Sequence, residues 1–347
     1  MSMVDWDTAT AVGRRFVPPG PAVTAAEAEE VVESLTAAAA AAVIPVRQTT
    51  RLVADPGTHR TVVVDRPAWI ESNIAGMRLL TSSLERRVDE RRDPNSFSAT
   101  AGGKATALQL GGMLSWVATK VLGQYEAITG PGNPGRLLLV APNIVATEQQ
   151  LDVPHDDFRM WVCLHEETHR VQFGAVPWLE DHFTAEVDTF LAGVELSNAD
   201  ALRRVAAIAA AVFGVLRGGS GVSIIDAAQT PAQRQVFERM TAFMSLLEGH
   251  ADYVMDAVGP EIVPSLPVIR SRFDQRRENP GAGDGLLRRL MGMDAKLRQY
   301  TEGRAFVSGV VDREGIEGFN QVWAGPQNLP TTAEIADPGA WVDRVLS

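Results

Sequence analysis

The sequence predicts a mainly α-helical protein of the α+β class, with a small β-hairpin or sheet. Three observations support this. Helix start and stop signals delimit several long segments, the apolar residues within them cover one face or more, and β-branched runs are few and short. The 347 residues suffice to bury a large core, either as one large domain or as two cooperating halves.

The first third of the chain is predicted to be helical around one strand. Thr24 and Glu27 have the spacing of a capping box, which opens a helix through an alanine tract. The run 61–64 is β-branched and predicts a strand. The predicted elements are a helix from Thr24 toward Pro45, a strand at 61–64, a helix from Pro67 to near Asp93, and a helix over about 105–128.

A glycine- and proline-rich cluster at 130–135 is the best candidate boundary, dividing the chain into an N-terminal part, 1–134, and a catalytic part, 135–347, which can also form one compact unit. Two short apolar runs, 137–140 and 143–145, predict a hairpin directly afterwards. Such a hairpin could pair with an extended peptide substrate. A structural hairpin that only covers the core is an equally good interpretation.

Residues 165–169 read His-Glu-Glu-Thr-His, an HExxH motif. Residues four apart lie on the same helix face, so His165 and His169 can reach one metal ion. Glu166 would then lie beside the open coordination position and act as a general base. We therefore expect His165 and His169 to be zinc ligands and Glu166 to be catalytic.

The segment around this motif predicts a buried helix. Proline and two aspartates at 154–157 suit the first turn, apolar residues surround most of the circumference, and Gly174 and Pro177 end the helix. Two histidines and a glutamate on one face of a buried helix must either be satisfied by hydrogen bonds or hold a metal.

The third metal ligand is predicted to be Glu248. A metzincin would need glycine and histidine where the chain has Gln172 and Ala175, so that class is excluded. Glu248 and Asp252 share one face of a helix that is predicted to begin at Thr230-Pro231. This pattern resembles the gluzincins, and the resemblance implies that Glu248 binds zinc while Asp252 orients His165 from outside the coordination sphere.

Several other residues stay open as alternatives. His250 is a rival third ligand, although it lies two residues from Glu248 and so on another helix face. Tyr300, with Arg304 one turn onward on a helix predicted over about 286–312, is a candidate to stabilise a developing oxyanion. Weaker candidates, each better interpreted as a surface or cleft residue, are His155, His182 and His59.

Further stretches resemble one family more specifically than the motif does. They are 64–69, 165–173, 177–179, 248–252, 299–307 and the tail 329–341. Together they resemble the actinobacterial zincin-like metallopeptidases, one branch of which is associated with deazaflavin-cofactor biosynthesis. The resemblance covers the chain from about Asp5 to the C-terminus. It implies a zincin-like helical catalytic core that holds Zn²⁺ and uses Glu166 as base.

The charge and the termini restrict partners and location. A net charge of −11 argues against nucleic acid or an anionic membrane as partner. The N-terminus resembles no signal peptide, no stretch reaches about 20 apolar residues, and one cysteine excludes an intrachain disulfide. These features predict a cytoplasmic protein.

The predicted function is zinc-dependent hydrolysis, with a peptide as the favoured substrate. Zinc would activate a water molecule and Glu166 would take its proton. Two alternatives remain: hydrolysis of a small amide linked to cofactor metabolism, and a non-catalytic scaffold stabilised by zinc. A closed pocket would favour the small molecule, whereas a site closed by four protein ligands would favour the scaffold.

Overall fold

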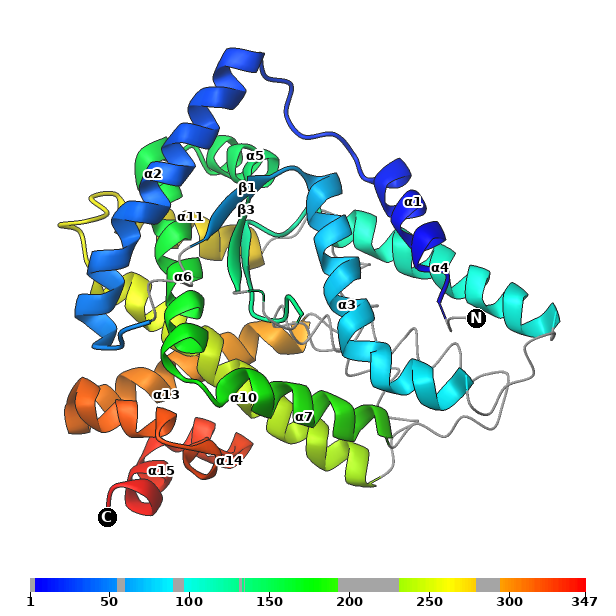
Figure 1. The fold of residues 1–347 in the computed structure, drawn as a ribbon. Helices are drawn as coiled ribbons and strands as arrows, with labels where there is room; N and C mark the ends of the chain where they lie inside the picture. Colours follow the sequence, from blue (N-terminus) through cyan, green and yellow to red (C-terminus); the bar gives the residue numbers. More distant parts are fainter. Residues whose placement is uncertain are drawn as a thin grey trace.

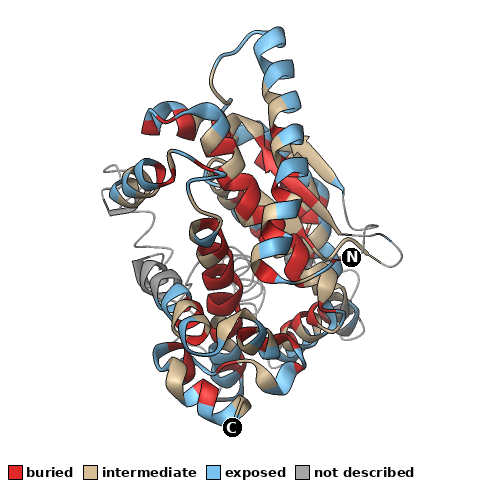
Figure 2. Ribbon diagram, turned by 90° about the vertical axis from the view of Figure 1, so that its left-hand side faces the viewer, coloured by how far each residue is buried: buried red, intermediate tan, exposed pale blue. Residues whose placement is uncertain are grey.

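The computed structural model describes residues 4–54, 60–89, 97–130, 133, 135–192, 231–278 and 294–347. Helices dominate these residues and surround one small sheet, so the predicted fold class is confirmed (Figure 1). Buried residues concentrate on the helix faces that meet in the interior, while the outer faces are exposed (Figure 2). No helix in the described ranges has the length and apolar character needed to cross a membrane.

The sheet has three strands in the order β1-β3-β2. The central strand β3 (Arg136–Val140) pairs in parallel with β1 (Thr61–Val64) and antiparallel with β2 (Gly123–Glu126). All four apolar residues of β3 are buried, as expected for a strand covered on both faces. Because β1 and β3 come from opposite sides of the predicted boundary, the sheet joins the two parts; the division itself stays a prediction.

The predicted second strand of the hairpin, 143–145, is wrong. These residues lie in helix α5 (Ala141–Leu151), which begins directly after β3 with Pro142 in its first turn. Proline suits that position because its missing N–H has no partner there in any case. The β-branched residues Ile144 and Val145 favour a strand locally, but in the helix both are buried.

The helix predicted over 105–128 is only partly correct. Helix α4 spans Phe97–Val117, and the chain then turns and forms β2 at Gly123–Glu126. The backbone of β2 is satisfied by pairing with β3, for example Gly123 opposite Leu139. This pairing is a tertiary contact that outweighs local helix propensity.

The motif helix, α6 (His155–Ala175), forms as predicted and lies between α2 (Ala25–Thr50) and the sheet (Figure 1). It packs against α2, α10 (Pro231–Ala257) and the sheet. The capping box of α2 is present, but the helix continues past Pro45 to Thr50. Apolar side chains of α6, including Phe158, Trp161 and Leu164, are buried in a core cluster.

The second ligand helix, α10, begins at Pro231 as predicted and packs most extensively against α13 (Asp294–Phe319). Gly249 and Gly303 face one another at this crossing, and a Cβ on either would collide with the other helix's backbone. The other helices of the described residues are α1 (Trp6–Phe16), α3 (Arg66–Asp89), α7 (Leu179–Ala192), α11 (Leu266–Glu278), α14 (Thr332–Ala336), α15 (Pro338–Val345) and the 3-10 turns Asn320–Trp323 and Pro326–Asn328.

Candidate metal centre

The two motif histidines lie on one face of α6 and converge. Their Nε2 atoms are 3.2 Å apart, and the ring planes are nearly perpendicular, at 88°. Each side chain reaches the same point from successive turns of the helix, as the spacing of four predicts.

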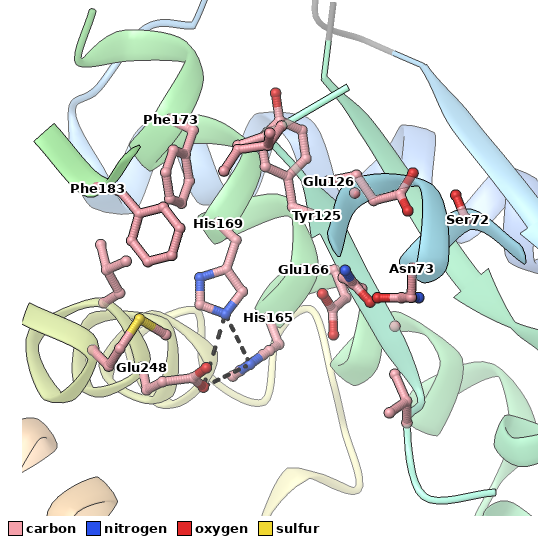
Figure 3. Close-up of a pocket in the computed structure, with 18 of the residues that line it drawn as sticks. Ser72, Asn73, Tyr125, Glu126, His165, Glu166, His169, Phe173, Phe183 and Glu248 are labelled. Atoms are coloured by element: carbon pink, nitrogen blue, oxygen red, sulfur yellow. Dashed lines mark hydrogen bonds and ion pairs between the residues drawn. The ribbon is translucent and has the colours of Figure 1, made fainter. Parts of the chain in front are cut away.

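Glu248 completes a cluster of three metal-binding groups. It projects from α10 toward the histidines, with Oε2 3.5 Å from His165 Nε2 and 3.8 Å from His169 Nε2 (Figure 3). Glu248 is buried, and one donor atom from each residue lies within 4.8 Å of the others. The structure thus brings together the three predicted ligands.

This arrangement fits zinc. A tetrahedral ion with bonds of about 2.0–2.2 Å separates neighbouring ligand atoms by about 3.3–3.6 Å, close to the three distances found here. Two imidazoles and one carboxylate are a common set for catalytic zinc, which leaves one coordination position for water or substrate. His165, His169 and Glu248 would hold the ion.

The second nitrogen of each imidazole is also engaged. His169 Nδ1 lies 2.9 Å from Gln172 Oε1, and His165 Nδ1 lies 3.2 Å from Met255 Sδ. A carbonyl oxygen and a thioether sulfur both accept hydrogen bonds, so both contacts favour a proton on Nδ1. Nε2 of each ring is then available as a metal ligand.

The two histidines differ in their proton affinity when no metal is bound. Burial lowers the pKa of His165, but the hydrogen bond to Glu248 and the charges of Glu166, Glu248 and Asp252 outweigh burial, so the net pKa is raised. Burial dominates at His169 and lowers its pKa, assisted by the neighbouring His165. In the metal-free site a proton therefore binds more readily to His165 than to His169.

His250, the rival ligand, faces away from the cluster. Its Nδ1 lies 3.1 Å from Gln172 Nε2, and its ring packs against Phe319 and Trp323 at centroid distances of 5.0 and 5.6 Å. Burial, with a smaller contribution from His169, lowers the pKa of His250 to about 3, so the ring is neutral. His250 is a buried neighbour of the site and does not join the three converging donors.

Glu166 lines the same pocket as the three ligands and is buried. Its side chain lies directly against Gly123 of β2: a Cβ at that position would be 2.5 Å from Cγ and 2.7 Å from Cδ of Glu166. The absence of a side chain at position 123 therefore leaves the space that Glu166 occupies.

Asp252 does not make the hydrogen bond to His165 that the resemblance implies. Among the described residues, its Oδ1 lies 3.5 Å from Arg270, and Arg270 also binds Asp256 at 2.7 Å. The charge of Asp252 nevertheless raises the pKa of both motif histidines. Among the interactions found here, Asp252 therefore acts on the two motif histidines through its charge.

The other candidates either lie outside the three-residue cluster or fall outside the described part of the chain. The backbone of Tyr300 belongs to α13, but its side chain is outside the described residues. Arg304 forms a 2.7 Å ion pair with Asp256. Two further histidines are described and are not in the cluster: His155 is exposed and pairs with the buried Glu148, and His182 packs against Trp178 and Phe243. His59 is outside the described residues.

The pocket at the metal centre has a volume of about 310 Å³ and two kinds of wall. Figure 3 shows aromatic rings on the His169 side and polar groups on the Glu166 side. The apolar wall comprises Met77, Leu80, Ile128, Phe173, Phe183, Met244 and Leu247. The polar wall comprises Ser72, Asn73, Gln124 and Glu126.

Two contributors to the site escaped the sequence analysis. Gln172 entered it only as evidence against a metzincin, although its spacing of three from His169 places the two side chains on one helix face. Gly123 carried no signal, because its role depends on a tertiary contact between β2 and α6.

A mainly helical core that carries HExxH on one helix, with a buried glutamate facing it from a second helix, is consistent with the zincin class of hydrolase folds. The chain belongs to the zincin-like metallopeptidase family, which matches residues 4–342, and membership implies a zinc cofactor. None of the curated proteins matches the chain. A crystal structure from Chloroflexus aurantiacus, described as "a putative hydrolase with a novel fold", is similar over 98% of both chains, with 30% sequence identity and a TM-score of 0.70.

Proposed function

We propose that the protein is a zinc-dependent peptidase, with His165, His169 and Glu248 as ligands and Glu166 as general base. The observation that carries this is the convergence of the three donor atoms in one pocket that Glu166 also lines. Glu166 is not needed to complete the ligand set. A non-catalytic zinc scaffold would have no use for a carboxylate held at that place.

In the proposed hydrolysis of an amide, the residues of the pocket have different roles. When bound, zinc supplies a Lewis acid that lowers the pKa of water and polarises the scissile carbonyl. Glu166 accepts the proton of the attacking water and passes it to the leaving amine. Gln172 and Met255 hold the imidazoles in the form that binds metal.

A peptide is the favoured substrate because β2 is an edge strand. β3 occupies one side of β2, and no strand among the described residues pairs with the other. All four residues of β2 line the pocket beside His165 and Glu166. An extended peptide can therefore add to the sheet by main-chain hydrogen bonds and bring a peptide bond to the metal. This strand takes the role that the sequence analysis gave to the hairpin.

The test is hydrolysis of a peptide library by zinc-loaded protein, with mass-spectrometric mapping of the cut sites. Chelation should abolish cleavage and added zinc should restore it. If peptides stay intact while small acylated amines are cleaved, the substrate is a small amide, the alternative that the resemblance in sequence left open. If neither class is cleaved, the scaffold interpretation replaces the enzyme.

A further inference from the structure

Gln172 is a fully buried side-chain amide that joins the two helices of the metal centre. Its Oε1 lies 2.9 Å from His169 Nδ1 on its own helix, α6. Its Nε2 donates a 2.9 Å hydrogen bond to the main-chain carbonyl of Leu247 on α10 and lies 3.1 Å from His250 Nδ1. Leu247 directly precedes Glu248, so the amide connects one ligand to the neighbour of another.

The carbonyl of Leu247 determines which atom donates and which accepts in each of these hydrogen bonds. A carbonyl oxygen only accepts, so the nitrogen end of the Gln172 amide must face it. The oxygen end then faces His169 and accepts its Nδ1–H, which leaves a lone pair on Nε2 of the neutral ring. The second amide hydrogen of Gln172 goes to His250 Nδ1, so the proton of His250 resides on Nε2.

His250 is held in this form at a cost. Its Nε2 is buried and has no hydrogen-bond partner among the described residues. An unsatisfied buried donor costs about 1–3 kcal/mol. Moving the proton to Nδ1 would place two donors face to face against Gln172, which would cost the amide one of its hydrogen bonds. His250 therefore stabilises the orientation of the Gln172 amide.

We propose that Gln172, supported by His250, is the positioning residue of the metal centre. It keeps Nε2 of His169 unprotonated and sets the separation of α6 and α10, so the ligands are arranged before metal arrives. This inference rests on the proposed function, because it assigns His169 as a ligand. Free neutral histidine prefers its proton on Nε2, where it would have to be removed before a metal could bind.

The test compares Gln172→Met with Asn143→Leu. Methionine keeps the volume and unbranched shape of glutamine but makes none of its hydrogen bonds. Asn143 is the matched control, a buried amide that also joins separate elements, through Arg66 Nε and the carbonyl of Ala118, both at 2.7 Å. Zinc affinity is measured by chelator competition, and the tautomer of His169 by ¹⁵N NMR of the metal-free ring.

Gln172→Met should weaken zinc binding by about 10–100-fold and shift His169 toward the Nε2–H form. Asn143→Leu should lower the unfolding temperature without either change. The proposal is overturned if Gln172→Met leaves affinity and tautomer as in the parent, or if Asn143→Leu weakens zinc equally. Should Gln172→Met not fold, His250→Phe replaces it and must shift the tautomer in the same direction. A parent protein that binds no zinc refutes the proposed function instead, while the metal-free tautomer still tests the hydrogen-bond chain.

Discussion

Gly123 lies so close to Glu166 that a single methyl group at position 123 would overlap the Glu166 side chain, 2.5 Å from its Cγ. The edge strand β2 and the motif helix α6 thus meet where hydrolysis is proposed to occur. The space available to Glu166, the proposed general base, is set by a residue that contributes no side chain of its own.

We expect Gly123→Ala to displace Glu166 and lower hydrolysis by about 100-fold, within the range of general-base contributions. Zinc content should stay at about one ion per chain, because the three ligands are not touched. Gly112→Ala is the control, since a Cβ there meets nothing within 4 Å. Steady-state rates and elemental analysis check both variants. Parental activity in Gly123→Ala would show that the observed position of Glu166 is not the catalytic one.

Glu166→Gln and Glu248→Gln should separate base from ligand. Glu166→Gln keeps the shape of the side chain but cannot take a proton, so it should retain zinc and lose hydrolysis by about 10²–10⁴-fold. Glu248→Gln weakens the coordination sphere and should lose both zinc and activity. Zinc stoichiometry and peptide cleavage are measured side by side. The reverse pattern, with zinc lost only from Glu166→Gln, would exchange the roles assigned to the two glutamates.

Asp252→Ala should weaken zinc binding by about 10-fold, because its charge favours a cation at both motif histidines. Asp256→Ala is the matched control. Asp256 also pairs with Arg270, but its charge is not among those that shift the pKa of His165 or His169. The zinc affinity of the Asp256→Ala protein should stay within about 3-fold of the parent. Equal losses in the two variants would indicate that the effect comes from Arg270 and not from the charge of Asp252.

The buried His250 predicts a pH dependence of stability. Its pKa is lowered to about 3 in the folded protein, against about 6.5 in an unfolded chain. Between these values the unfolded state binds more protons, so the free energy of unfolding falls as the pH falls from 6.5 toward 3, by up to about 1.4 kcal/mol per pH unit from this group.

His250→Phe removes this contribution. Urea unfolding of the metal-free parent and variant across pH 4–6.5 should therefore show a shallower pH dependence in the variant, even though its stability at neutral pH is lower. Metal-free protein is used so that release of zinc in acid does not add to the slope. Identical slopes would mean that His250 is protonated in the folded state.

The convergence of the two motif histidines was predictable because it is encoded in local spacing. His165 and His169 are four residues apart, and this spacing alone places them on one face of α6. The choice of Glu248 as the third residue could not be made from local spacing, because the sequence near α6 does not show which acidic helix packs against it. The pattern shared with Asp252 identified the helix, but the hydrogen bond assigned to Asp252 is replaced by its contact with Arg270.

The errors in the predicted fold arise where long-range pairing decides. The segment 143–145 is β-branched yet lies in α5, and 123–126 forms β2 although it was assigned to a helix. In both cases the error concerns the partners of β3. The sequence analysis paired β3 with the segment that follows it, whereas its actual partners, β1 and β2, both precede it in the sequence. Local propensity carries no information about that choice.

The proposed ligands lie on two helices, α6 and α10, and are separated by about eighty positions in the sequence. Tight metal binding would therefore report that these two helices have come together during folding. A chain in which only α6 has formed offers two imidazoles, enough for weak and short-lived binding. The full affinity appears when α10 docks and brings Glu248. Cobalt(II) absorbs visible light when it is bound in a tetrahedral site, so it can be used to follow the assembly of this site. During refolding, its absorption should rise when α10 docks, later than the formation of the helices themselves.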